Sequence, residues 1–537
     1  MKRLLFIIGV LLTLLNTAHA QKPNNYPPDN KNVKIVSTNL PIVWIEVGGA
    51  MILKDERITA RMKIIHNGNG QLNYADTVAH PGQRIDYEGY IGIRYRGNST
   101  FAYGRKPYSF RPLDKPLEEG GVKKKVDILG MGKDNNWALL APYFDRSMIR
   151  DMLAYSLARP WMEYTPEGRH CEVYLDGIYY GVYVLVEVVS KGKTRLNLDD
   201  PGTAGDAITG GYIMELDRNE PPVYVSAFAP TTNAGKPIDG RYIYYQYNSP
   251  DYEDMVTSQI NYITKQIYMM ESAFASKDYC DPETGYRKYI DVMSFIDYQL
   301  AQELAHNLDA YRYSVKLFKR RDSVDPRFKL ALWDMDMTYG LANYNAAWYT
   351  HGWRYHLNDT LLNGGDSNFM PLWWIKLNDD PEYTAALKNR WKEYRRSNVA
   401  ESRVMAVVDS LALVLTTGGA IDRNSQAWPR WGQYVWPNYY VSDSFEDEIA
   451  YLKRWIKGRI AWMDLQLGFD SLARDRGDVN GDYLINIKDV TTLINYLMTG
   501  DKTLIYRLAA DCNQDLRLNI RDVTTLINYL MSGQWPK

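Results

Sequence analysis

The sequence predicts an α+β large domain that is rich in strands at its start, followed by a small all-α module. Up to about residue 135, short runs alternate between apolar and polar residues and end at glycine-containing turns. From about residue 381 to 467, apolar residues recur with the helical period instead. Near the C-terminus the segment VTTLINYLM occurs twice, beginning at residues 490 and 523, which marks an internal repeat. Strands first and helices later are typical of the α+β class.

Length and charge limit the possible organisation and partners. The chain has 537 residues, of which 45% are hydrophobic and 24% charged, and this is too long for one hydrophobic core, so two to four domains are expected. A net charge of -1 provides no field that would attract nucleic acid or an anionic membrane. The 43 Tyr and 15 Trp residues are common in extracellular proteins that contact carbohydrate or peptide, but they also fill β-rich cores.

The N-terminus has the pattern of a secretory signal peptide, residues 1–20. A basic start precedes an apolar run at 4–15, and AHA at 18–20 fits a small-x-small cleavage site. The apolar run is shorter than the roughly 20 residues that a membrane-spanning helix needs. Residues 21–34 are rich in Pro, Asn and Lys, which predicts a disordered leader. We therefore expect a secreted or cell-surface protein without a membrane span.

The expected large domain spans residues 35–470, with a β-rich first part to about residue 135. Its expected strands are at residues 41–47, 90–96, 171–189 and 328–333, where 171–189 is a hairpin. Its expected helices are at residues 137–159, 253–278 and 289–306, with more between 381 and 467. The three cysteines, Cys171, Cys280 and Cys512, fit neither a disulfide framework nor a zinc site, and a Cys171–Cys280 bridge is left open.

The C-terminal repeat contains two 12-residue loops, 478–489 and 511–522, whose spacing suits calcium. A calcium ion takes six to eight oxygen ligands, and such a loop supplies them from positions 1, 3, 5, 7, 9 and 12. In the first loop these positions hold Asp478, Asn480, Asp482, the Leu484 carbonyl, Asn486 and Asp489. In the second loop they hold Asp511, Asn513, Asp515, the Arg517 carbonyl, Asn519 and Asp522. The pattern predicts two bound calcium ions, in preference to two Asx-rich turns without metal.

Two departures from the EF-hand loop are visible. Position 12 is Asp rather than Glu, and position 6 is Tyr483 or Leu516 rather than Gly, although that turn prefers positive φ. Asp at position 12 is used by dockerin repeats, so residues 475–537 resemble a type I dockerin. The resemblance implies tethering to a cohesin-like domain or surface scaffold through exposed residues early in the two helices. The residues in such places are Lys488, Thr491, Thr492, Arg521, Thr524 and Thr525.

Two segments of the large domain gather acidic side chains next to apolar strands. HNLDAYRYSVKLFK at 306–319 contains Asp309, and LWDMDMTYG at 332–340 contains Asp334 and Asp336. Carboxylates at strand ends can converge on one metal ion, and phosphoryl transfer uses one carboxylate to orient the acceptor hydroxyl and others to hold Mg²⁺. Paired Asp residues also occur often as caps, turns or calcium ligands.

Four motifs in order along the chain make the pattern more specific. They are RYRGNSTFAYGRKPYSFR at 94–111, the D-G-x-Y-x-G-V-Y-x-L-x-E hairpin at 176–187, N-x-D-x-Y-R-x-S at 307–314 and W-D-x-D-x-x-x-G at 333–340. Together they resemble the CotH family of atypical protein kinases, over about residues 38–467. The resemblance implies an atypical protein-kinase-like fold that binds ATP and Mg²⁺ and phosphorylates Ser on secreted or coat proteins.

Site residues carried over by the resemblance begin with the acidic ones. Asp309 resembles the catalytic aspartate that accepts the hydroxyl proton. Asp334 resembles the metal-binding aspartate, with Asp336 as a second ligand or its supporter. Ser314 occupies the place of the Asn that is the second metal ligand in a kinase catalytic loop. A hydroxyl is a poorer Mg²⁺ ligand than an amide oxygen.

The nucleotide-binding residues implied by the resemblance lie elsewhere. Lys106 is the candidate phosphate-contacting lysine, with Arg96 nearby in the same loop. Glu187 is a candidate partner of that lysine, and Trp333 a candidate to stack on adenine. Each also has a plain structural interpretation, as a surface lysine, a strand-end ion pair, a solvent-facing strand residue or core packing. No G-x-G-x-x-G loop is present to cover the phosphates.

Two other functions remain open. One is a non-catalytic extracellular scaffold or carbohydrate-associated surface protein that keeps only the fold. The other is a glycoside hydrolase, which needs two carboxylates roughly 5 to 10 Å apart. Glu215, Asp217 and Asp309 are its candidates, but no spacing supports them. The kinase hypothesis itself requires Asp309, Asp334 and Asp336 to meet around a single divalent cation beside a nucleotide-sized cleft.

Overall fold

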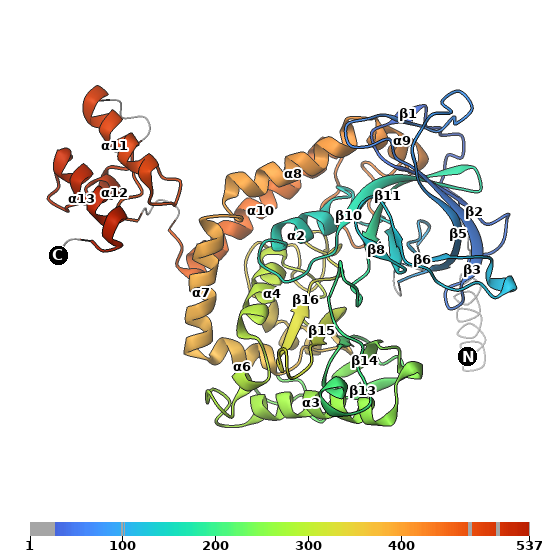
Figure 1. The fold of residues 1–537 in the computed structure, drawn as a ribbon, viewed down its shortest axis with the longest axis horizontal. Coiled ribbons are helices and arrows are strands. Elements are labelled where there is room, and N and C mark those ends of the chain that lie inside the picture. The colour runs from blue at the N-terminus through green and yellow to red at the C-terminus, as the bar shows by residue number, and fades with distance from the viewer. Residues whose placement is uncertain (1–26, 98–99, 101–102, 471–474, 501–504, 536–537) are drawn as a thin grey trace, which may run out of the picture. The chain divides into compact units, whose positions relative to one another are not determined.

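A computed structural model describes residues 27–97, 100, 103–470, 475–500 and 505–535. The predicted signal peptide therefore lies outside the described residues. The chain forms two compact units (Figure 1). The first unit is Met1–Thr384 with Met405–Gly458, and the second is Ala385–Val404 with Arg459–Lys537. Strands and helices are mixed and the N-terminal region is rich in strands, which confirms the predicted α+β class at this level.

The first unit begins with a closed seven-stranded barrel. Around the barrel the strands are β10 (Gly168–Leu175), β11 (Ile178–Glu187), β9 (Trp137–Leu140), β6 (Tyr108–Leu113), β5 (Ile85–Tyr95), β3 (Ile58–Ile65) and β2 (Ile42–Glu46). Neighbours are antiparallel except β10 and β2. Because side chains alternate along a strand, Ile91, Ile93 and Tyr95 of β5 are buried inside, and Arg94 lies on the outer face. Two short ladders complete the strands of this region, β1 (Ser37–Thr38) with β4 (Asn73–Tyr74) and β7 (Val126–Asp127) with β8 (Lys133–Asp134).

One sequence prediction is wrong in this region. A helix was expected over residues 137–159, but Trp137–Leu140 is strand β9 and only Arg150–Ala158 is helical, as α2. β9 pairs with β6 and β11, so its apolar run is buried in the barrel wall rather than on a helix face. Pro142 cannot donate the backbone hydrogen bond that a continuous helix requires.

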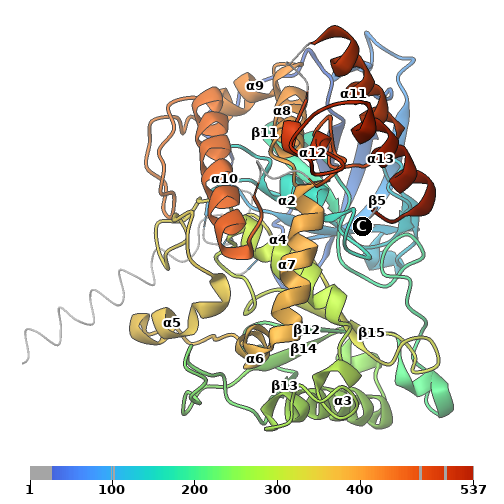
Figure 2. The same ribbon diagram turned by 90° about the vertical axis from the view of Figure 1, so that its left-hand side faces the viewer.

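The first unit also contains a second sheet, which carries part of the candidate site described below. Its order is β13 (Val223–Val225), β14 (Tyr244–Ser249), β12 (Tyr212–Leu216), β15 (Val315–Lys319) and β16 (Phe328–Ala331), all antiparallel. Figures 1 and 2 show α3 along the outer side of this sheet. The helices of this part are α3 (Thr257–Ala275), α4 (Val292–Ala305), α5 (Asn358–Gly364), α6 (Trp373–Asp379) and α9 (Ala420–Ala427). Of these, α4 packs on β16 and on α2, and α9 packs on β11 of the barrel.

The second unit contains the C-terminal repeat. Its helices are α11 (Ile487–Thr499), α12 (Arg507–Ala510) and α13 (Ile520–Ser532), which share a small core around Val490, Leu493, Val523 and Leu526. Three longer helices, α7 (Pro381–Arg395), α8 (Glu401–Thr416) and α10 (Phe445–Leu467), contribute residues to both units.

Two whole-chain expectations can be compared with the described residues. Cys171, Cys280 and Cys512 are all unpaired, so the Cys171–Cys280 bridge does not form. No single helix of the described ranges has the length and apolar composition to cross a membrane, whereas α8 and α9 meet that test as a pair bent by 69°.

Candidate functional site

The segment that carries Asp309 is positioned by the end of α4. The helix ends at His306, whose φ of 47° turns the chain sharply. Asn307 is buried, and its Oδ1 accepts a hydrogen bond of 3.1 Å from the Asp309 N–H. The Asn307 amide also donates to the Asp334 carbonyl over 3.3 Å. One buried amide therefore joins the two acidic segments that lie apart in the sequence.

The segment that carries Asp334 follows β16 and is held by α2. Asp334 has a left-handed φ of 61°, and its Oδ2 accepts a hydrogen bond of 2.9 Å from the Ser314 hydroxyl. Its N–H donates to the Tyr155 hydroxyl over 3.2 Å. The next residue, Met335, donates its N–H to Asp151 over 2.8 Å. Two side chains of α2 thus fix the backbone that presents the Asp334 carboxylate.

The acidic residues open into one cavity of about 290 Å³. Asp309, Asp334 and Asp336 all line it, together with Ser314, Asp151, Asp145, Arg218, Arg312 and Asp366. A second cavity of about 1000 Å³ shares Arg96, Gly97, Arg218, Ser314 and Asp334 with the first. The three carboxylates therefore line one cavity beside a larger cleft, but within the described residues they do not form a cluster close enough to hold one metal ion by themselves.

Burial and mutual repulsion shape the charges of this cavity. Burial raises the pKa of Asp336 well above its ordinary value, and the Asp334 and Asp151 carboxylates raise it further. Burial, and next the Asp334 carboxylate, raises the pKa of Asp151 to about 7. Burial also raises the pKa of Asp309, although the nearby Arg312 guanidinium opposes this. Carboxylates crowded in this way favour a bound cation.

Oxygen side chains are the ligands that Mg²⁺ prefers, so Asp334, Asp336 and Ser314 fit this ion chemically. Among the described residues, no three His, Cys, Asp or Glu side chains gather closely enough to hold a metal ion by themselves. Mg²⁺ usually keeps several waters and takes one or two carboxylates together with substrate phosphates. At such a site, waters and substrate phosphates would complete the coordination of Mg²⁺.

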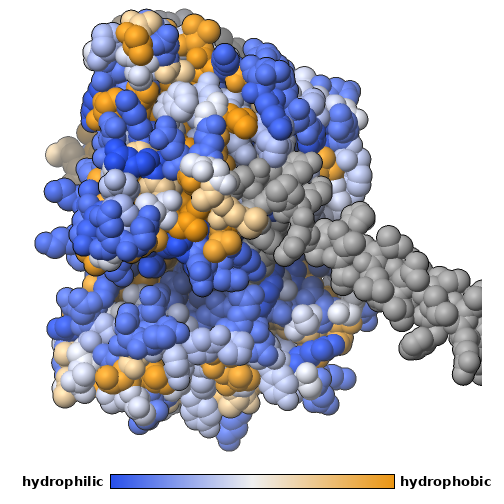
Figure 3. Space-filling view, turned by 90° about the vertical axis from the view of Figure 1, so that its right-hand side faces the viewer, coloured by the Kyte–Doolittle hydropathy of each residue, from blue (hydrophilic) through white to orange (hydrophobic). Residues whose placement is uncertain are grey.

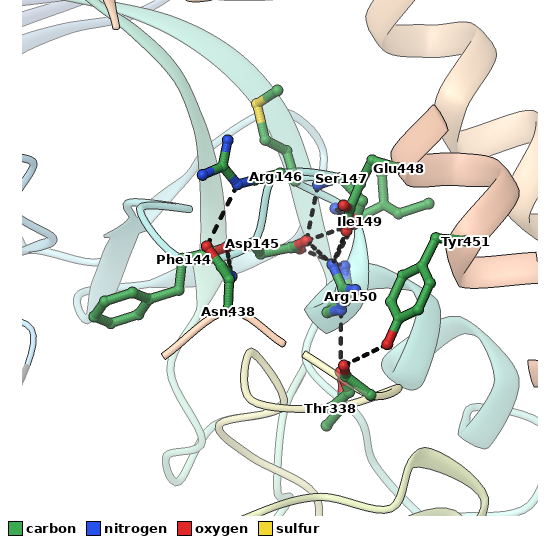
Figure 4. A network of polar contacts seen from close by, with 12 residues as sticks. Phe144, Asp145, Arg146, Ser147, Ile149, Arg150, Thr338, Asn438, Glu448 and Tyr451 are labelled. Atoms are coloured by element: carbon green, nitrogen blue, oxygen red, sulfur yellow. Dashed lines mark hydrogen bonds and ion pairs between the residues drawn. The ribbon is translucent and has the colours of Figure 1, made fainter. Parts of the chain in front are cut away.

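A buried network of ion pairs and hydrogen bonds lies next to the smaller cavity (Figure 4). Arg150, on α2, contacts the Asp145 carboxylate and lies 3.0 Å from Glu448. Its Nε donates to the Thr338 carbonyl over 3.0 Å. Thr338 lies two residues after Asp336, so the network ties α2 to the turn that follows the acidic segment. All three charged groups are almost fully buried, and each depends on its partners there.

The nucleotide-side residues divide into two sets. The Arg96 guanidinium lies over the Trp333 ring, 4.9 Å from its centroid, and both line the larger cavity. Lys106 lines neither cavity; it is buried, with its ammonium 5.6 Å from the Tyr95 ring centroid. Tyr95 belongs to the barrel core, which explains why the lysine does not reach the cleft.

Glu187 is not a partner of Lys106. Its carboxylate lies 3.5 Å from Arg195 and accepts hydrogen bonds from the Tyr164 hydroxyl at 3.1 Å and the Glu167 N–H at 2.9 Å. It lines neither of the two cavities that contain Asp334. Glu187 ends β11 and is buried, so the expectation of a solvent-facing or lysine-paired glutamate is corrected to a buried structural ion pair.

The three hydrolase candidates are divided between the two cavities. Glu215, on β12, forms an ion pair with Lys316 and accepts a hydrogen bond of 3.1 Å from Asn248. Burial, and next the Glu215 carboxylate, raises the pKa of Asp217 to about 6. Both line the larger cavity, whereas Asp309 lines only the smaller one. The described geometry gives no support to that hypothesis.

The two C-terminal loops share one backbone conformation. Position 4 has a positive φ in both, 74° at Gly481 and 60° at Gln514, and position 6 has a φ of 63° at both Tyr483 and Leu516. The position-12 carboxylate closes each loop. Asp489 accepts the Val479 N–H at 2.8 Å and the Asn486 N–H at 2.9 Å. In the second loop, Asp522 accepts the Asn513 N–H at 3.2 Å and the Asn519 N–H at 2.8 Å.

The acidic ends of these loops are buried. Asp478 and Asp489 are almost fully buried in the first loop, and Asp511 and Asp522 in the second. Two buried carboxylates at the ends of one short loop repel each other, and a cation between them would stabilise the loop. Their oxygen donors, with the amide and carbonyl oxygens of the loop, are a hard-ligand set that suits Ca²⁺.

A family model described as CotH kinase protein matches residues 93–463. The chain belongs to the CotH kinase protein family. A second family model, described as Dockerin type I domain, matches residues 476–531 of this CotH protein. Both resemblances drawn from the sequence motifs are confirmed. No curated protein matches the chain. A type I dockerin domain binds calcium, implies a cohesin partner and suggests an extracellular or surface location.

Several residues of the CotH site were missed by sequence reasoning. Asp151 and Tyr155, which fix the Asp334 backbone, have no signal in the sequence, since they lie on a helix more than 170 residues away. Arg312 contacts both Asp309, at 3.4 Å, and Asp366, at 2.7 Å. It is the Arg of the N-x-D-x-Y-R-x-S motif, so a basic partner three residues after the aspartate was visible in the pattern.

Proposed function

We propose that this CotH-family protein is an extracellular, atypical kinase-like enzyme that uses ATP and Mg²⁺ to phosphorylate Ser on secreted or surface proteins. The observation that supports this most strongly is the meeting of Asp309, Asp334 and Asp336, from two separate segments, in one cavity that adjoins a larger cleft. The barrel and the second sheet supply opposite sides of that cleft, as the two lobes of a kinase do.

Each acidic residue has a distinct proposed role. Asp309 accepts the proton of the acceptor hydroxyl, and Arg312 keeps its carboxylate in place. Asp334 would be the principal metal ligand, and Ser314, which donates a hydrogen bond to its carboxylate, would supply a further oxygen ligand. Asp336 is a second ligand or supports the first. When bound, ATP with Mg²⁺ supplies the phosphoryl group and neutralises the charge that develops on it.

The remaining chain organises these groups. Asp151 and Tyr155 hold the backbone of Asp334 from α2, and the Arg150 network holds α2 itself. Positioning of this kind contributes much of the rate in phosphoryl transfer, where the protein makes few covalent steps of its own. The C-terminal dockerin module tethers the enzyme to a cohesin-like partner, in a manner that depends on calcium.

The test is a melting-temperature titration of the mature full chain with ATP and Mg²⁺. We expect a stabilisation that Asp334→Ala abolishes, because the principal metal ligand is lost. Asp309→Asn should keep the stabilisation but lose phosphotransfer from ATP. Asp239→Ala is a matched control, since Asp239 is exposed and lines neither cavity. A chain that ATP and Mg²⁺ do not stabilise at any concentration would contradict the proposal.

A second candidate function is a non-catalytic, carbohydrate-associated surface protein. The observation that favours it is a group of exposed rings near the smaller cavity, Tyr434 and Trp436, of which Trp436 lines the cavity and stacks on Tyr344. Exposed aromatic faces are suited to sugar rings. This candidate expects glycan binding that Trp436→Ala removes and no effect of ATP on the melting temperature.

A further inference from the structure

We propose that four arginines of the barrel form a wall that binds the polyphosphate chain of the phosphoryl donor. These residues, here called the arginine wall, are Arg57, Arg94, Arg96 and Arg111. The inference rests on the proposed function, and it identifies what replaces the absent glycine-rich loop and the lysine that points into the barrel.

The arginine wall belongs to three neighbouring segments of the barrel. Arg94 and Arg96 follow the outer face of β5 and the residue after it, and Arg111 lies on β6 opposite Gly92. Arg57, directly before β3, reaches across to the Gly92 carbonyl at 3.1 Å and the Ser109 carbonyl at 2.9 Å. All four line the cavity of about 1000 Å³.

Gly92 of β5 lies next to the Arg57 side chain. A Cβ at this position would lie 3.4 Å from the Arg57 Cδ and 3.6 Å from its Cβ. The Arg57 guanidinium bonds to the carbonyls of Gly92 on β5 and Ser109 on β6, and Arg111 is the β6 partner of Gly92. The guanidinium groups of Arg57, Arg94 and Arg111 therefore share one part of the cleft surface, although like charges repel there.

Carboxylates lie near the arginine wall, Asp55 and Asp251 by Arg94 and Asp334 by Arg96, but they form no ion pair with it. Within the described part of the chain, none of its members has a carboxylate oxygen within 4.0 Å. The Arg111 Nε is buried without a hydrogen-bond partner. Burial, and next the charges of Arg111, Arg94 and Arg96, lowers the pKa of Arg57 to about 9. A bound anion with several charges would relieve both the repulsion and the unsatisfied donors.

The position of the wall relative to the acidic cavity indicates a phosphate chain. Arg96 covers Trp333, the residue before Asp334, so the wall starts beside the metal-binding carboxylate. From Arg96 back to Gly92 the strand extends about 14 Å at about 3.4 Å per residue, which is long enough for several successive phosphates. Guanidinium groups bind phosphate oxygens in pairs, and this suits arginine better than lysine.

The surface drawn in Figure 3 is consistent with a phosphate chain at the arginine wall. Figure 3 shows a hydrophilic recess between the upper part of that face, where the barrel lies, and the lower part, where the second sheet lies. On the far side of the cavity are Asp334, Glu215 and Asp217. A metal-bound polyphosphate matches both sides at once, since its cation faces the carboxylates and its oxygens face the arginines.

The experiment measures binding of inorganic tripolyphosphate with Mg²⁺ to the mature full chain by calorimetry. We expect Arg94→Gln and Arg111→Gln each to weaken the binding of tripolyphosphate and of ATP about tenfold, because each removes one charged hydrogen-bonding group. Arg94→Lys should lose part of the affinity because it keeps the charge but not the paired bonds. Arg61→Gln is the matched control: Arg61 is exposed on β3 of the same barrel and lines neither cavity.

The ligand-free variants give a second measurement. Because the arginines repel one another, Arg111→Gln should keep or raise the melting temperature of the ligand-free chain, so weaker binding cannot be attributed to unfolding. Tripolyphosphate binding that depends on the wall, without any binding of ATP, would support the inference and refute the proposed function. ATP binding that depends on Asp334 but not on Arg94 or Arg111 would support the proposed function and refute the inference.

Two further results would overturn the inference. One is the absence of tripolyphosphate binding by the wild-type chain. The other is binding of a sulfated polysaccharide, such as heparin, that Arg94→Gln and Arg111→Gln abolish while tripolyphosphate binding stays unchanged. That pattern would show that the wall contacts an acidic glycan rather than the donor.

Discussion

Glu271 is a fully buried carboxyl group on α3, under the second sheet. Its Oε1 accepts a hydrogen bond of 2.6 Å from the Tyr245 hydroxyl, and its Oε2 accepts one of 2.7 Å from the Ser226 hydroxyl. No ion pair joins it anywhere in the described ranges. Burial, only partly opposed by these two hydrogen bonds, raises the pKa of Glu271 from 4.5 to about 7. The folded chain therefore holds this proton more tightly than the unfolded chain does.

The sign of the pH effect follows from this difference. Between about pH 4.5 and 7 the folded state binds a proton that the unfolded state has released, so the free energy of unfolding falls as the pH rises through this window. The difference between 4.5 and about 7 corresponds to about 3 kcal/mol, at about 1.4 kcal/mol per pH unit. Above pH 7 the full loss in the free energy of unfolding is present, and below pH 4.5 this loss is absent.

The perturbation is Glu271→Gln, which is neutral at every pH and keeps a hydrogen-bond acceptor for Tyr245. Urea denaturation at pH 5 and pH 8 gives the free energy of unfolding of both chains. We expect the free energy of unfolding of the variant, relative to that of the wild type, to rise by about 2 to 3 kcal/mol from pH 5 to pH 8. The control is Glu88→Gln, because Glu88 is exposed on β5. Parallel stability profiles for Glu271→Gln and the wild type would refute the reasoning.

Four other outcomes are expected. Arg150→Met should lower the free energy of unfolding by about 3 to 5 kcal/mol in urea, since it leaves two buried carboxylates unpaired, and a loss below 1 kcal/mol would contradict this. Chelation should lower the melting temperature of the C-terminal module, an effect that Asp489→Asn should reduce. Leu516→Gly should tighten calcium binding roughly fivefold, about 1 kcal/mol, by relieving a φ of 63° at an exposed residue; unchanged affinity would refute it. A thiol reagent should label only Cys280 in the native chain, because Cys171 and Cys512 are buried, and three adducts would contradict it.

The C-terminal module was the part most accessible from sequence. Its ligand positions repeat at an offset of 33 residues, from 478 to 511, and short-range hydrogen bonds within each loop fix the conformation. The conformation of each loop is therefore encoded within a few residues, and the packing of the two helices follows from the repeated apolar pattern. The lost glycine at position 6 was read as a difficulty, and the structure shows Tyr483 and Leu516 adopting the left-handed conformation that glycine would favour. Backbone geometry here follows from the loop as a whole rather than from one residue.

The acidic site was predicted in its central members but not in its support. Motif order was enough to select Asp309 and Asp334, because each lies at the end of a helix or strand with a recognisable apolar pattern. Asp151 and Tyr155 come from α2, and only tertiary packing brings them to the Met335 and Asp334 backbone. Local periodicity contains no information of that kind.

Lys106 shows why a motif does not determine a role. The KPY segment matches a family pattern, and the resemblance implies a phosphate contact for Lys106. In the structure Lys106 lies two residues before Tyr108, whose ring is inside the barrel, and the lysine stays on that side with Tyr95. Strand alternation would have been the better guide. Arg94 is two residues from Arg96 and adjacent to the buried Ile93, so strand alternation places it on the outer face of the barrel.

The two sides of the cleft explain each other electrostatically. On one side the carboxylates of Asp334 and Asp336 repel each other, and on the other Arg94 and Arg111 are neighbouring cations that form no ion pair within the described residues. Each side by itself raises the free energy of the folded chain. A divalent cation alone relieves only the acidic side, and a polyphosphate alone would lie next to unneutralised carboxylates. Bound together they relieve both sides, so Mg²⁺ and the phosphate chain should each increase the affinity of the other by the same factor.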